Sequence, residues 1–138
     1  MAQRCGLTTP LVIKDLQSGY VGQTGTVWTV QPDCNYSVAR QIGPKIGEPH
    51  KRGRLSAEQA QRLTALIDRA DLDRLPNQLG SAPQPNARQI TIAYGRNQSA
   101  LTLPPGSEAA AAFRAVGSDP RATHVLELMH ALNEMVGG

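Results

Sequence analysis

The chain has 138 residues and a formal net charge of +3; 40% of its side chains are hydrophobic, 18% are charged and only 4% are aromatic. This length suits one folded domain, residues 1–138, and the apolar share is large enough to build a core. No run of about eighteen apolar residues occurs, so no membrane span is predicted. The start lacks the apolar stretch of a signal peptide, which fits either a protein that stays inside the cell or a mature chain with an added methionine.

Three strands are predicted in the first third of the chain. Residues 11–17 are rich in β-branched and apolar side chains, and residues 24–31 alternate around Trp28 with the period of two typical of strands. Residues 35–42 alternate in the same way. Pro32 separates the second strand from the third, because proline cannot donate to a strand ladder. We therefore expect three consecutive antiparallel strands.

A helix is predicted after a long loop at residues 43–54. Ser56 is a favourable N-cap, and Gln59 follows at the spacing of a capping box. The apolar residues of this segment recur at helical spacing and predict one buried stripe: Ala60, Leu63, Leu66, Ile67 and Ala70. Residues 71–76 end the helix with a short turn.

Two further strands and two helices are predicted in the second half. Residues 89–94 and 99–103 form strands joined by a short connection. Ser107 begins a short helix, and Asp119 with Pro120 has the N-cap and first-turn chemistry of the last one. The order βββ-α-ββ-αα predicts an α+β fold, with an antiparallel sheet of about five strands and helices packed on one face.

Basic residues exceed acidic residues by 14 to 11, and they form one local cluster. The cluster comprises Lys45, His50, Lys51, Arg52 and Arg54. It lies in a loop rich in glycine and proline, and aromatic side chains on which bases could stack are scarce. We therefore expect a solvated basic loop, and the sequence argues against a nucleic-acid partner.

No motif for catalysis or cofactor binding is present. The sequence contains no nucleophile elbow, P-loop, dinucleotide-binding glycine motif or zinc-protease helix motif. His124 and His130 are six residues apart on one predicted helix, so they cannot ligate a metal as an i, i+4 pair does. With Glu127 and Glu134 they are expected to form a solvated polar stripe. We expect no enzyme activity, no metal and no cofactor.

The only two cysteines, Cys5 and Cys34, flank the hairpin of the first two strands almost symmetrically. This placement is compatible with the short Cα separation that a disulfide requires. Such a bond would close a loop of about thirty residues and stabilise the fold by about 3–4 kcal/mol. It would favour a secreted or periplasmic location for a chain whose signal peptide has been removed. The alternative is a pair of buried free thiols.

The tip of the first hairpin is the candidate site for a partner. Its residues combine polar and glycine positions with one aromatic and one branched apolar side chain: Ser18, Gly19, Tyr20, Val21, Gly22 and Gln23. Glycine permits positive φ and close approach of another backbone, and an exposed apolar tip is typical of a contact surface. The alternative is a tip that folds back, with Tyr20 packed on its own sheet.

Several segments together resemble the emfourin family, small proteins that inhibit protealysin, a thermolysin-like metalloprotease. The resemblance spans about residues 11–104 and rests on the tip at 18–22, the strand bearing Trp28, and the segments 53–59, 70–76 and 90–94. The tip differs from the family pattern, which has consecutive glycines before its apolar residue.

The resemblance implies a non-enzymatic, protein-binding module that blocks a protease cleft with its hairpin loop. Tyr20 and Val21 would be the anchors, Gly19 and Gly22 would set the backbone shape, and residues 77–80 would add a second contact edge. We expect a monomer. Two alternatives remain open: a secreted or envelope-associated structural or interaction domain without inhibitory activity, and a weak binder of nucleic acid or anionic surfaces that uses the basic cluster at residues 45–54.

Overall fold

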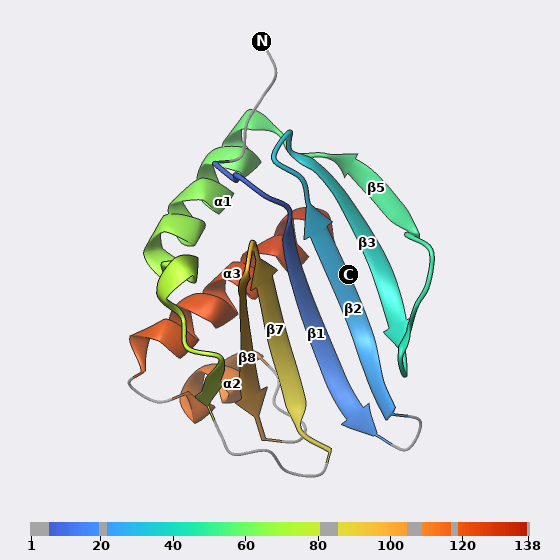
Figure 1. Ribbon diagram of the computed structural model, residues 1–138, viewed down its shortest axis with the longest axis vertical. Helices are drawn as coiled ribbons and strands as arrows, with labels where there is room; N and C mark the ends of the chain where they lie inside the picture. The colour runs from blue at the N-terminus through green and yellow to red at the C-terminus, as the bar shows by residue number, and fades with distance from the viewer. Residues whose placement is uncertain (1–5, 20–21, 81–85, 105–108, 117–118, 138) are drawn as a thin grey trace.

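The computed structural model describes residues 6–19, 22–80, 86–104, 109–116 and 119–137 (Figure 1). Its strands are β1 (Leu11–Gly19), β2 (Gly22–Val30), β3 (Asn35–Ile42), β4 (Lys45–Ile46), β5 (Lys51–Arg54), β6 (Gln78–Gly80), β7 (Arg88–Tyr94) and β8 (Asn97–Leu103). Its helices are α1 (Ala57–Ala70), α2 (Ala109–Ala115) and α3 (Pro120–Val136), with a short 3-10 turn at Leu72–Arg74. The α+β class is confirmed.

The described strands form one mixed, mostly antiparallel sheet in the order β4-β3-β2-β1-β7-β8-β6, with β5 also paired to β3. Only β6 runs parallel to its neighbour, β8. All five predicted strands are present, but the expectation of a purely antiparallel sheet of about five strands is wrong. The three additional strands are short segments, two of them in the predicted loop at 43–54. They lack a long hydrophobic alternation and become strands because β3 and β8 offer them unpaired backbone edges.

The core joins one face of this sheet to α1 and α3, which pack together (Figure 1). Alternate residues of each strand point to this core face, and their side chains meet those of the helices. The fully buried members include Leu11, Ile13, Val38, Ile90, Leu101 and Leu103 from the sheet, and Leu63, Leu126, Leu128 and Leu132 from the helices. Figure 1 shows α3 crossing behind the central strands.

Helix α1 begins and ends as its sequence predicts. The Ser56 hydroxyl accepts a hydrogen bond from the Gln59 backbone N–H at 3.1 Å, and the Gln59 side chain accepts one from the Ser56 backbone N–H at 2.8 Å. This reciprocal pair is the predicted capping box. The helix ends at Asp71, which adopts the left-handed conformation with φ 51°. Asp119 caps α3 by accepting from the Arg121 N–H, again as predicted.

The polar stripe of α3, for which a solvated face is expected, partly faces α1 instead. Glu134 lies 3.0 Å from Arg62, and Glu127 lies 3.1 Å from Arg69. The hydrogen bond from Arg62 lowers the pKa of Glu134 below its usual value. About half of each side chain in the Arg62–Glu134 pair remains exposed, so these pairs orient the two helices more than they stabilise the fold.

Strands β1 and β2 approach each other so closely at Gly25 that a side chain does not fit. Gly25 pairs with Leu16, and a Cβ at this position would overlap the backbone carbonyl oxygen of Asp15. A backbone atom cannot move aside as a flexible side chain can. Gly19, on the facing strand, has open space around the position of a Cβ.

Gly25→Ala is therefore expected to destabilise the protein by about 1–3 kcal/mol, through forced displacement of β1 against β2. Gly19→Ala is the matched control, since it adds the same methyl group to the same hairpin without an overlap. Urea unfolding monitored by circular dichroism measures both. Equal stability of the two variants would contradict the close approach.

Candidate functional site

The predicted contact tip lies where β1 and β2 end. Their pairing continues to Gly19 opposite Gly22, and both glycines are exposed. Ser18 and Gln23, one pair further in, are half-buried. The two predicted anchors, Tyr20 and Val21, lie outside the described residues, so the structure places only the base of the tip.

Hydrogen bonds to both sides hold this base. On one side, the Ser18 N–H donates to the Ala87 carbonyl at 3.0 Å. On the other, the Gly43 N–H donates to the Gln23 carbonyl at 2.7 Å. The Gln23 side-chain amide also donates to the Gln89 side-chain oxygen at 2.9 Å, which joins β2 to β7 across β1. The base of the tip is thus fixed to two neighbouring segments, the start of β7 and the turn after β3, which limits the entropy that a partner must remove on binding.

The two glycines of the tip have different structural roles. Gly22 has φ +94°, a conformation that residues with a side chain rarely adopt, and a Cβ added there would contact the Gly43 Cα at 3.5 Å. Gly19 has neither a positive φ nor a close neighbour. Of the two glycines expected to set the backbone shape, only Gly22 adopts a backbone conformation that favours glycine.

Two exposed isoleucines lie beside the tip, one at the end of β3 and one at the end of β4. Ile42 is 60% exposed and Ile46 is 48% exposed, more than any other large hydrophobic side chain in the described ranges. The bond from Gly43 to Gln23 holds the turn between these strands against β2. Ile42 pairs with Lys45 and Ile46 with Gln41, so the two isoleucines project from opposite faces of the sheet. We call Gly22, Gln23, Ile42, Lys45 and Ile46 the hairpin-end surface.

Sequence reasoning missed this extension of the site. Ile42 fits the alternation of its strand and therefore suggests a core position, but it lies beyond the part of the sheet that the helices cover, as its exposure shows. Ile46 stands next to Lys45 in a segment that is typical of a solvated loop. An isoleucine between charged and glycine residues was the one available signal.

The predicted second contact edge does not adjoin the tip. Gln78–Gly80 forms β6, at the opposite edge of the sheet, and β7 and β8 lie between it and β1. Leu79, its central residue, is 5% exposed and belongs to the core. This segment is therefore an edge strand with a core residue, and its residues do not extend the hairpin-end surface.

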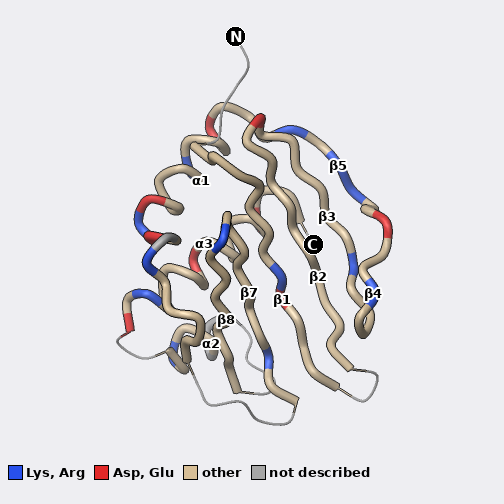
Figure 2. Tube along the Cα trace, in the orientation of Figure 1, with Lys and Arg blue, Asp and Glu red and all other residues tan. Residues whose placement is uncertain are grey.

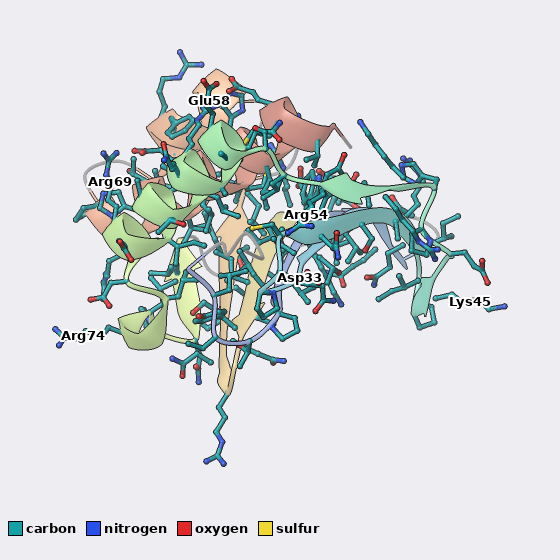
Figure 3. All side chains as sticks on the ribbon, turned by 90° about the horizontal axis from the view of Figure 1, so that it is seen from above. Asp33, Lys45, Arg54, Glu58, Arg69 and Arg74 are labelled. Carbon is teal, nitrogen blue, oxygen red and sulfur yellow. The ribbon has the colours of Figure 1, made fainter. Side chains whose placement is uncertain are left out.

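The basic cluster forms an ordered edge instead of a loop. Lys51, Arg52 and Arg54 lie on β5, and Lys45 on β4, with Glu48 between the two strands (Figure 2). Figure 3 shows Lys45 and the labelled residues Arg69 and Arg74 pointing outward on opposite sides of the molecule. The positive charges of this edge are exposed, and Lys45 belongs both to the basic cluster and to the hairpin-end surface.

The predicted disulfide involves one residue that lies outside the described part of the chain, Cys5. Its predicted partner Cys34 is fully buried in the core and adopts φ 74°. Among the described residues no cysteine is free. The pairing of the two cysteines stays a prediction.

The chain matches no protein-family model and no curated protein. Within the described ranges, no three or more His, Cys, Asp or Glu side chains gather where they could hold a metal ion. No helix in that part of the chain is long and apolar enough to cross a membrane. The case for the hairpin-end surface as a contact site therefore rests on the exposure of its side chains and on its hydrogen bonds.

Titration of thiols in denaturant measures the state of the two cysteines. We expect no reactive thiol before reduction and two after it, because a disulfide consumes both sulfur atoms. The same titration of Cys34→Ser, in which Cys5 has no partner, is the control and should give one thiol without reduction. Two reactive thiols in the unreduced protein would contradict the disulfide.

Proposed function

We propose that this protein is a non-enzymatic binding module whose hairpin-end surface contacts another protein. The observation that carries the proposal is the exposure of Ile42 and Ile46 beside the tip that the sequence selects as a contact. Large apolar side chains left in water at one end of a rigid sheet are typical of surfaces that a partner covers.

The rigidity of the surface supports the same proposal. The backbone bonds from Ser18 to Ala87 and from Gly43 to Gln23 hold the base of the tip on both flanks. Gly22, the first residue of β2, adopts a positive φ that residues with a side chain rarely take. A base held in this way loses little conformational freedom on binding, which favours tight association through a small contact.

The partner implied by the family resemblance is a thermolysin-like metalloprotease. Under this proposal the hairpin enters the active-site cleft, with Tyr20 and Val21 as its apolar anchors. Ile42 and Ile46 then contact the rim of the cleft from the two faces of the sheet, and Lys45 favours an acidic rim. Inhibition of this kind requires no catalytic group on the inhibitor.

Titration of thermolysin with the protein tests the proposal. We expect peptidase activity to fall to zero at a one-to-one ratio, and Tyr20→Ala to raise the inhibition constant by about thirtyfold, the loss typical of a central anchor. Ile42→Ser should raise it by a smaller factor, because rim contacts contribute less. Both variants should keep the wild-type melting temperature.

Arg96→Ala is the matched control. Arg96 is exposed on the turn between β7 and β8, at the opposite end of the sheet from the tip, and its loss should leave inhibition unchanged. A large fall in melting temperature for Tyr20→Ala would show that Tyr20 packs on its own sheet. Full peptidase activity in the presence of excess protein would remove thermolysin-like proteases as partners and favour a structural or interaction domain.

A further inference from the structure

A cavity of about 460 Å³ lies between the sheet and helices α2 and α3, in the range of volumes that small-molecule sites occupy. Its walls come from β1, β2, β3 and β7 on the sheet side. The proposed contact with a protein does not use it. Its lining combines a row of polar side chains with a set of buried apolar ones.

The polar row crosses three neighbouring strands. Asp15 on β1 is directly opposite Thr26 on β2, which is directly opposite Arg40 on β3. All three line the cavity. Because directly opposed residues of a sheet point to the same side, their side chains all project toward the helices.

Asp15 is already neutralised by an arginine. The Arg88 guanidinium donates to both carboxylate oxygens of Asp15, at 2.8 Å each, and both side chains are less than a quarter exposed. The hydrogen bond to Asp15 raises the pKa of Arg88 above its usual value, so Arg88 stays cationic. This bidentate pair leaves the wall around it with no net charge.

Arg40 leaves one positive charge in the cavity without compensation. Its side chain is exposed, and it forms no ion pair with any residue of the described ranges. The histidine of the opposite wall, His130, lies 3.1 Å from Glu134 and adds no second unpaired charge. The cavity mouth therefore presents a guanidinium, with the Thr26 hydroxyl beside it as a second donor.

The other part of the lining is apolar. Trp28 follows Thr26 by two residues on β2, so it projects to the same side, and it is 2% exposed. Leu126 and Met129 from α3 are also buried, and Phe113 from α2 is partly buried against the core. A ligand that enters past Arg40 thus meets an aromatic and aliphatic surface beyond it.

We propose that this cavity binds a small monocarboxylate with an apolar body. The carboxylate pairs with the Arg40 guanidinium and accepts a hydrogen bond from the Thr26 hydroxyl. The apolar body packs on Trp28, Phe113 and Met129, where it removes apolar surface from water. This assignment matches the lining, because Arg40 is the cation that Asp15 does not neutralise and the apolar side chains beyond it carry no charge.

The protein contains its own reporter of binding, because Trp28 is its only tryptophan. We expect 4-phenylbutyrate to change the Trp28 fluorescence in a saturable way. The neutral analogue 4-phenylbutyramide should bind about tenfold more weakly, since it lacks the charge that pairs with Arg40. The indole N–H, which donates to the Gly137 carbonyl at 2.8 Å, gives one resolved NMR signal that should shift at the same ligand concentrations.

Arg40→Gln should abolish the preference for the acid over the amide, and Arg40→Lys should keep part of it. Arg52→Gln is the matched control, an arginine on the same sheet that lies outside the cavity, and it should retain the full preference. Circular dichroism confirms that each variant is folded. Equal affinity of the wild type for acid and amide, an unchanged preference in Arg40→Gln, or binding that leaves the indole signal in place would each overturn the proposal.

Discussion

Strand β1 is the constraint on which the rest of this structure depends. It pairs with β2 on one side and with β7 on the other over most of its length, so its backbone has no free edge. Its core-face side chains change character along the strand, from Leu11 and Ile13 to Asp15 and Gln17. The first two build the dry core against the helices. At Asp15, the same alignment places a polar group between sheet and helix, and this residue lines the cavity.

Much of the architecture follows from local sequence. The five long strands and helices α1 and α3 carry clear periodicity and capping residues, and Ser56 with Gln59 makes the hydrogen bonds that their spacing predicts. The three short strands carry no such pattern. Lys51–Arg54 is a run of charge with one glycine, and it is a strand because β3 supplies the partner. At this segment, pairing with the neighbouring backbone determines the secondary structure, and the β-propensity of its residues does not.

The candidate site shows the same limit at the level of side chains. The tip is visible in the sequence as a cluster of glycines, yet its flank at Ile42 and Ile46 depends on where the helices stop covering the sheet. The ion pair between Asp15 and Arg88 joins residues that are 73 positions apart. Asp15 did carry a signal, because an aspartate at a core-face position after Leu11 and Ile13 requires a buried partner. Which partner it takes depends on the register of β1 and β7.

The charged edge strand β5 has a consequence for the behaviour of the protein in concentrated solution. An edge strand exposes backbone groups that a second copy of the sheet could pair with, and such pairing leads toward aggregates. Here Lys51, Arg52 and Arg54 would face identical cations on an approaching copy. Their mutual repulsion opposes sheet-to-sheet growth at this edge, and added salt, which shortens the range of that repulsion, weakens the protection.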